Sequence, residues 1–506
     1  MMLRRNLPPA LILLASPAMA DISADDVWTN TVAFYQATGG TLTAELNRDG
    51  DTVFVDNPVL NYRFPFDAGS LQISMPPMTM VEETDGSVTQ KLPKSFDLAL
   101  DLQTPPMIMG DFSFVTVVTQ ADFAATATGT AGDITYNRDA AAYGATIEFD
   151  VGEEEFGGIS MAFEITGDGY AQTTRVTEGD LIEVVSDSTT EPMRYSFRSD
   201  EGYGYRSEGS GTYGTTTSRV RMALPLAGLD FTNLAPAFAA GMFVEGTTTT
   251  TRSRDESVTY FEDTVATREV TSVGPGQSTL RLSADGLVGS GEVQDIAVMF
   301  EENTFTGLNV SVDIDNGSAS YRVPFMAADD PQDLNLNMLL TGLTLNDETW
   351  DLFNPDGTIP RDPADLRLDL SSTVNLGVDL LDFMGLEAAF AGADVPIKIE
   401  TLTLDVFDLD VAGVSANGTG AFTFDNDDLE TFDGFPRPEG SGAIEITGAN
   451  GLLDKLIAAG LVPQSEAGMG RMMLGMFTRP TGDDQLTSTL EVNAEGQILV
   501  NGERIR

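Results

Sequence analysis

An acidic segment late in the chain holds the side chains best suited to binding a metal ion. Its carboxylates are Asp425, Asp427, Asp428 and Glu430. Calcium prefers oxygen ligands, and carboxylates this close in sequence can converge on one ion. The segment lacks the central glycine and the distant glutamate of an EF-hand loop, so a solvated turn after a strand is the competing interpretation. Calcium is the only cofactor that the sequence suggests, and these residues are its weak candidate ligands.

Most familiar catalytic machinery is excluded by composition. The chain has no histidine and no cysteine. It therefore lacks an imidazole base, a thiol nucleophile and the usual zinc ligands, and it cannot form disulfides. No lysine belongs to a Ser-x-x-Lys motif, and no Gly-x-Ser-x-Gly motif is present. A pair of carboxylates could still act on a glycan, but 78 acidic residues make any named pair arbitrary. We predict no catalytic residue.

A glycine motif at Gly209–Gly214 matches the pattern G-x-G-x-x-G. The dinucleotide-binding fingerprint requires a strand before the motif and a helix after it. Here the motif lies in a Gly-, Thr- and Tyr-rich region and continues into Thr215–Thr217, which favours a strand. We interpret it as part of a β-structure and predict no nucleotide site.

A methionine-rich stretch near the C-terminus is the most suggestive apolar feature. Met472, Met473, Met476 and Phe477 would share one surface of a helix predicted over 466–477. Methionine side chains adapt to varied apolar ligands, so this surface could bind one. The favoured alternative is structural. With a preceding helix over 452–461, the stretch would form a helical hairpin that caps the end of a sheet.

The elements around these candidates follow a β-pattern. Short runs of alternating apolar residues recur along the chain, as in 334–345, 366–381 and the hairpin 397–424. A helix is expected near the N-terminus, where Ser23 and Asp26 form a capping box. The sequence predicts a mainly β fold with elongated or curved antiparallel sheets. Helical segments are expected near the N-terminus, in mid-chain and near the C-terminus.

Two β-rich domains are expected, because 506 residues exceed the usual size of one compact core. We place the first at 21–325. Its apolar insert over 224–244 is expected to form one or two short helices or an apolar turn, with a break at Pro236. The second is placed at 326–506 and includes the helical hairpin. Trp350–Gly357 is expected to be a turn-bearing connector within it.

The first 20 residues have the pattern of a secretory signal peptide. Arg4 and Arg5 precede a short apolar run, and Ala18 and Ala20 form the small-x-small pattern before a cleavage site. The run is too short to span a bilayer. We expect cleavage after Ala20 and a periplasmic location.

The charge balance restricts the partners. The chain has 78 acidic and 27 basic residues, a formal net charge of −51. Such a surface repels nucleic acid and anionic lipid head groups, so neither is an expected partner. The acids are spread along the whole chain, which favours a role in solubility in salt over a single cation site.

Several segments resemble one family of exported bacterial proteins. They are the stretch from Trp350 to Leu370, the stretch 422–440, the helical region 452–480 and the closing NGERIR, with the opening DISADDVW also similar. They resemble the domain-of-unknown-function 2125 family over nearly the whole mature chain. The resemblance implies an envelope location. The family has no assigned activity, so it implies no functional residues.

These observations favour a non-enzymatic envelope protein. A curved sheet could hold a lipid or another apolar ligand in its concavity, and a lipid or an envelope protein is the expected partner. A carboxylate-based enzyme acting on envelope or extracellular glycans is the main alternative. An outer-membrane barrel is a third hypothesis, disfavoured by the helical segments.

Overall fold

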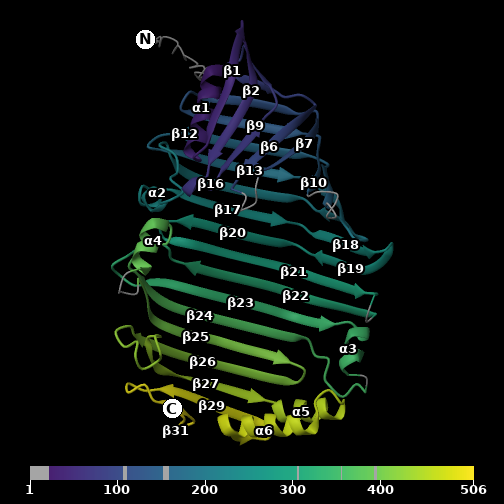
Figure 1. The fold of residues 1–506 in the computed structure, drawn as a ribbon, viewed down its shortest axis with the longest axis vertical. Helices are drawn as coiled ribbons and strands as arrows, with labels where there is room; N and C mark the ends of the chain where they lie inside the picture. The colour runs from purple at the N-terminus through teal and green to yellow at the C-terminus, as the bar shows by residue number, and fades with distance from the viewer. Residues whose placement is uncertain (1–21, 106–110, 152–158, 305–306, 355, 392–395) are drawn as a thin grey trace, which may run out of the picture.

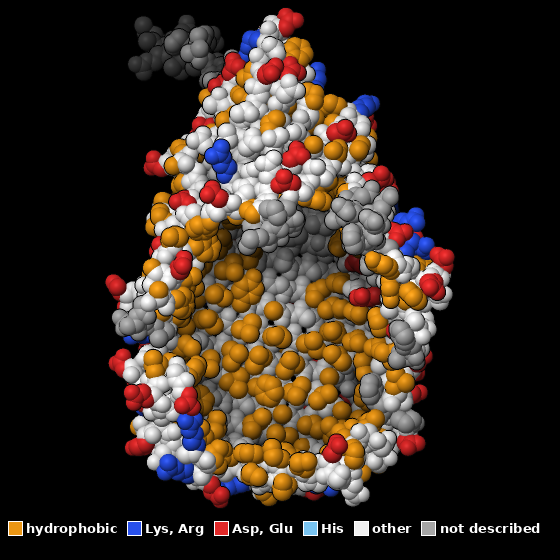
Figure 2. Space-filling model, in the orientation of Figure 1, with side chains coloured by type: hydrophobic (Ala, Val, Ile, Leu, Met, Phe, Trp, Pro, Cys, Tyr) orange, Lys and Arg blue, Asp and Glu red, His pale blue; other side chains and the backbone are white. Residues whose placement is uncertain are grey.

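The computed structural model describes residues 22–105, 111–151, 159–304, 307–354, 356–391 and 396–506. Their 31 strands belong to one sheet, and every strand pairing is antiparallel. The sheet curves around a deep hollow that is open toward the viewer in Figure 2. The chain begins at the narrow end of the molecule and finishes at the wide end (Figure 1).

The narrow half has two walls that share their first strands. These are β1 (Thr41–Asp49) and β2 (Thr52–Arg63). Wall A, in order of pairing, comprises β3 (Ser70–Ser74), β6 (Ser95–Gln103), β7 (Phe112–Ala121), β10 (Ala142–Val151), β11 (Ile159–Gly167), β14 (Met193–Gly202), β15 (Tyr205–Tyr213), β18 (Ser253–Phe261) and β19 (Thr264–Val273). Wall B comprises β4 (Met78–Glu82), β5 (Val88–Lys91), β8 (Ala124–Thr130), β9 (Asp133–Ala140), β12 (Tyr170–Glu178), β13 (Leu181–Thr190), β16 (Thr216–Pro225), β17 (Phe243–Thr250) and β20 (Gly276–Ser283).

The walls merge at a single long strand, β21 (Gly286–Glu302). Its first half pairs with β20 of wall B and its second half with β19 of wall A. Beyond it, long strands cross the whole width of the sheet (Figure 1). They are β22 (Leu308–Val323), β23 (Gln332–Leu345), β24 (Ala364–Leu376), β25 (Ile397–Val411), β26 (Val414–Asp425) and β27 (Arg437–Thr447). The sheet finishes with β28 (Arg479–Gly482), β29 (Gln485–Val492), β30 (Ile498–Val500) and β31 (Glu503–Arg504).

A line of bends, here called the crease, separates wall A from wall B. The chain passes from one wall to the other with one to three residues between strands, as at Ala141 between β9 and β10. Hydrogen bonds continue through the bends, since Gly214 N donates to Arg252 O at 2.7 Å and Gly274 N donates to Gln294 O at 2.9 Å. Pro192 and Pro275 lie at such bends. A proline cannot donate to a ladder and is therefore tolerated where regular pairing is interrupted.

The crease continues through the long strands as residues with positive φ. Asp295 in β21 has φ 51° and Gly342 in β23 has φ 73°. Before Asp295 the apolar positions of β21 are odd-numbered, as in Val293, whereas after it they are even-numbered, as in Val298 and Phe300. The left-handed residue reverses the alternation of faces, so the strand can bend while the same surface stays apolar.

Short helices occupy the edges of the sheet. They are α1 (Ala24–Ala37), α2 (Ala235–Ala239), α3 (Asp347–Phe353), α4 (Phe383–Phe390), α5 (Ala449–Ala458) and α6 (Gln464–Phe477), and a 3-10 turn spans Pro65–Asp67. The capping box predicted for the first helix is present, because Asp26 N donates to Ser23 Oγ at 3.1 Å and Ser23 N donates to Asp26 Oδ2 at 2.9 Å.

The predicted fold class is confirmed: the protein is mainly β with a few helices. The hairpin predicted over 397–424 is present as β25 and β26, and the helices predicted over 452–461 and 466–477 are present as α5 and α6. A short helix expected in the apolar insert is present as α2, but Pro236 lies in its first turn instead of breaking the insert, since proline is well tolerated there. The connector 350–357 has the expected turn, where Gly357 N donates to Asn354 O at 3.0 Å. Its first part is helical, because Asn346 caps α3 by accepting from Thr349 N at 2.8 Å.

The predicted domain boundary at 325 falls between β22 and β23, which pair with each other along their length. The predicted signal peptide lies outside the described residues.

Candidate ligand-binding groove

The wide half of the sheet carries rows of apolar side chains on one face, here called the inner face. Residues directly opposite in an antiparallel ladder point to the same side, so the pairing register defines each row. One row runs through Tyr321, Leu336, Leu370, Leu404 and Leu490. The adjacent row contains Met338, Leu368, Phe407 and Ile444, and a third contains Leu340, Leu366, Leu409, Ala416, Ile446 and Leu486. Figure 2 shows that hydrophobic side chains line the hollow, which identifies it with the inner face.

Across most of the wide half, the inner face is not covered by other parts of the described chain. Side chains on it retain large exposed fractions, among them Leu280 at 47%, Met338 at 37%, Leu402 at 40% and Leu490 at 41%. Contiguous apolar patches of more than a few hundred Å² are rare on soluble monomers and usually mark a binding surface. The hollow is therefore an open apolar groove.

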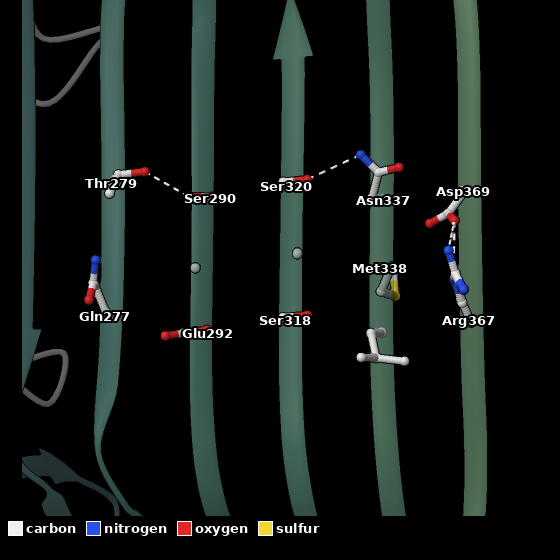
Figure 3. Close-up of a pocket in the computed structure, with 13 residues that line it drawn as sticks. Gln277, Thr279, Ser290, Glu292, Ser318, Ser320, Asn337, Met338, Arg367 and Asp369 are labelled. Atoms are coloured by element: carbon white, nitrogen blue, oxygen red, sulfur yellow. Dashed lines mark hydrogen bonds and ion pairs between the residues drawn. The ribbon is translucent and has the colours of Figure 1, made fainter.

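The opposite, outer face is polar. Its rows include Thr279, Ser290, Ser320, Asn337 and Asp369, which lie directly opposite one another. Figure 3 shows this face, where Thr279 and Ser290 hydroxyls lie 2.7 Å apart and Asn337 Nδ2 donates to Ser320 Oγ at 3.1 Å. The depression there, of about 500 Å³, also contains the ion pair of Arg367 with Asp369 at 2.7 Å. The hydroxyl and amide groups bond across the strands and the ion pair forms within β24, which suits a solvated surface.

A second depression, of about 560 Å³, lies on the inner face beside the crease. Val293, Met338 and Leu340 line it from the long strands, and Tyr213 and Val273 line it from wall A. This volume lies within the range of small-molecule sites. The crease brings apolar side chains of wall A and of the long strands together at this depression.

Wall A adds one polar pair to the inner face. Tyr195 Oη donates to Asp255 Oδ1 at 2.7 Å, and these residues share a register row through Gly211. Burial, then the hydrogen bond to the carboxylate, raises the pKa of Tyr195. Phe163 stacks on the Tyr195 ring at a centroid distance of 6.0 Å. The phenol thus stays neutral and bonded, and it presents a polar group within an aromatic surface.

Helix α1 closes the narrow end by packing on the inner face of wall B. Val27 belongs to the same buried cluster as Ile134 and Val184 of that wall. Asn30, only 1% exposed, accepts from Tyr136 Oη at 2.8 Å and donates to Glu178 Oε1 at 2.7 Å. The inner face is therefore a closed core at the narrow end and an open groove at the wide end.

The predicted calcium ligands form a different arrangement. Asp425 and Asp428 both pair with Arg437, at 2.7 and 2.9 Å, and Asp428 also accepts from the Thr431 amide. Hydrogen bonds from Thr431 and Arg437 lower the pKa of the Asp428 carboxyl. Across the described residues, no cluster of acidic side chains has the geometry to hold a metal ion. Here a guanidinium group supplies the counter-charge, and calcium binding stays a prediction.

The predicted methionine surface lies on α6 at the wide end. Met472, Met473, Met476 and Phe477 are 61%, 49%, 59% and 37% exposed. Sequence reasoning did not single out the side chains of the groove itself. Their signal was the alternation of Leu334, Leu336 and Met338, which indicates a strand with one apolar face but not that the face is left open.

Comparison with known proteins identifies one family model, described as an uncharacterised protein conserved in bacteria, DUF2125, which matches residues 261–502. The matched region contains most of the wide half and the hairpin α5–α6. No curated protein and no solved structure matches the chain. No helix in the described ranges is both long and apolar enough to cross a membrane.

Proposed function

We propose, from the geometry, that the protein binds lipid acyl chains in its apolar groove; the DUF2125 family model that residues 261–502 match is described without an activity. The supporting observation is the unpartnered inner face across β20–β29, where Leu280, Met338 and Leu490 remain exposed. We further propose that it works in the periplasm after removal of residues 1–20.

The free energy available fits a lipid. A ligand that covers about 400 Å² of apolar surface gains roughly 10 kcal/mol before the cost of immobilising it. The groove is long and lined by side chains of one kind, so its contacts depend on apolar area rather than on a fixed set of hydrogen bonds. Such a surface selects flexible chains more than compact polar molecules.

Adjacent residues of β23 provide a matched test. Met338 and Leu336 belong to the inner face, whereas Leu339 and Asn337 belong to the outer face, and Met338 and Leu339 are similarly exposed at 37% and 39%. We expect Leu336→Glu with Met338→Glu to lower the bound lipid at least tenfold, because a charge in the groove loses hydration when a chain covers it. Asn337→Glu with Leu339→Glu should leave it unchanged.

Native mass spectrometry of the protein purified from its own periplasm, followed by lipid extraction, measures this. Unfolding midpoints of both variants confirm that they are folded. A wild-type protein that carries no lipid and takes up none from vesicles would falsify the proposal, as would equal losses in both variants.

A further inference from the structure

We propose that α6 docks the wide end of the groove onto the surface of a lipid bilayer. The inference rests on the proposed lipid-binding function and concerns a different surface. Its starting point is a stripe on α6 formed by Met469, Met472, Met473, Met476 and Phe477, here called the Met stripe.

The Met stripe has helical spacing but faces away from the protein. Met469, Met472 and Met476 are 58%, 61% and 59% exposed, whereas Ala467 on the other side of the helix is 1% exposed. An amphipathic helix normally directs its large apolar residues into the core. In α6 the less exposed side carries Ala467 and Leu474, whereas the large flexible methionines face outward, which is the arrangement of a helix that lies on an interface.

The hairpin that carries the stripe is held in place by the sheet. Asp484, between β28 and β29, accepts from the backbone amides of Asn450 and Gly451 at 3.0 and 2.8 Å and thereby caps α5. An ion pair between Arg471 and Asp454 joins α6 to α5. These hydrogen bonds hold α5 against the sheet and the ion pair holds α6 against α5, so together they keep the Met stripe facing outward.

The net charge of the α5–α6 hairpin indicates which kind of surface the Met stripe binds. Between 449 and 477 the acids Asp454 and Glu466 are balanced by Lys455 and Arg471, so the hairpin is neutral in a chain of net charge −51. Elsewhere the acidic surface opposes approach to an anionic head-group layer, because desolvation and repulsion act together. A neutral apolar face can approach a zwitterionic bilayer without that cost. We therefore assign the Met stripe to a zwitterionic surface.

The Met stripe is continuous with the groove. The carbonyl of Phe477, the last residue of the stripe, accepts from Ser488 Oγ at 2.6 Å and from Asn501 Nδ2 at 2.9 Å. Ser488 lies in the inner-face row of Ile444, next to the row of the exposed Leu490. Figure 2 shows hydrophobic side chains along the rim at this end. An acyl chain leaving the bilayer beside α6 would thus meet apolar surface all the way into the groove.

Flotation with phosphatidylcholine vesicles tests the proposal on the full mature chain. The wild type should float with the vesicles, and Met472→Glu with Met476→Glu should reduce the bound fraction at least tenfold. Met472→Leu with Met476→Leu should bind as the wild type does. The control is Leu352→Glu with Leu339→Glu, which places the same charges at exposed apolar positions of α3 and the outer face and should not change binding.

Two further measurements separate the outcomes. Adding phosphatidylglycerol should weaken binding at low salt and not at high salt, since screening removes the repulsion. The glutamate variant should keep the lipid already in its groove, because its substitutions lie outside the groove. A wild type that floats with the vesicles but carries no lipid would contradict the proposed function and leave the docking proposal standing. Absence of wild-type flotation, or equal loss in the control, overturns the docking proposal. A wild-type dimer that the glutamate variant converts to monomer would do so too, because a second copy would then cover the stripe.

Discussion

At the scale of residues, the informative groups are polar side chains buried among apolar ones. Asn30 on α1 bonds to Tyr136 of wall B and to Glu178, which ties the helix to the wall at a single buried position. A buried polar group costs free energy unless it is bonded, so this contact fixes where α1 lies more than it adds to stability. None of the three residues could be paired from the sequence, because more than a hundred positions separate Asn30 from its partners.

Replacing Tyr136 by phenylalanine should lower the free energy of unfolding by about 1–3 kcal/mol at neutral pH, because Asn30 Oδ1 loses its donor in a buried site. Urea unfolding measures the change. Asn137→Ala, at an exposed neighbouring position, should cost much less. Equal costs in the two variants would contradict the role of the hydrogen bond.

The same substitution should alter the response to alkaline pH. Burial raises the pKa of Tyr136 from 10.0 to about 12. Its contribution to stability is therefore complete below pH 10 and is lost as the pH rises from 10 to about 12, where the unfolded chain ionises first. Stability of Tyr136→Phe should fall less over this interval than that of the wild type. A parallel decline would show that other groups dominate.

At the scale of elements, the crease explains which parts of the fold were predictable. Alternation identifies strands because each strand has one apolar face, and Gly and Pro mark the ends of those strands. The sequence does not reveal that many of these ends are bends within a continuing ladder rather than reversals. A bend at Asp168 and Gly169 and a reversal at Gly179 and Asp180 use the same two residue types, and only the long-range pairing distinguishes them.

Gly342 tests the crease. Its φ is 73°, and a Cβ at this position would collide with the carboxylate of Asp315 in the neighbouring strand. Gly342→Ala should destabilise the protein by about 1–3 kcal/mol, since an L-residue is strained in this conformation. Gly246→Ala is the matched control, because the nearest atom to its new Cβ, Arg219 O, is 3.9 Å away. Thermal unfolding of both variants measures the difference. If Gly342→Ala unfolds at the same temperature as the wild type, the crease does not require glycine at this position.

At the scale of the whole molecule, the two faces of the sheet differ in chemistry. The outer face carries bonded polar groups and cross-strand ion pairs, such as Glu245 with Arg221 at 2.8 Å and with Arg281 at 2.6 Å. Isolated exposed pairs contribute little, so these contacts mainly balance local charge. The excess of acids remains, and the sheet must hold its curvature against the resulting repulsion.

Salt should therefore stabilise the protein. We expect the unfolding temperature to rise with sodium chloride, because the Debye length falls to about 3 Å at 1 M. Calcium chloride at equal ionic strength should give a comparable rise if Arg437 alone balances Asp425 and Asp428. A larger, saturable rise at micromolar calcium would instead reveal a specific site. An unfolding temperature independent of salt would contradict the repulsion argument.

The alternation of the chain between walls A and B has a consequence for size. Each passage across the crease and back adds two strands to each wall, and each strand advances its wall by about 4.8 Å. Inserting or removing one such pair of strands in both walls would change the length of the hollow by roughly 10 Å while leaving the cap formed by α1 and the rim formed by α6 unaltered. The number of strand pairs in the walls therefore sets the length of the hollow, and with it the length of ligand that the proposed function would allow.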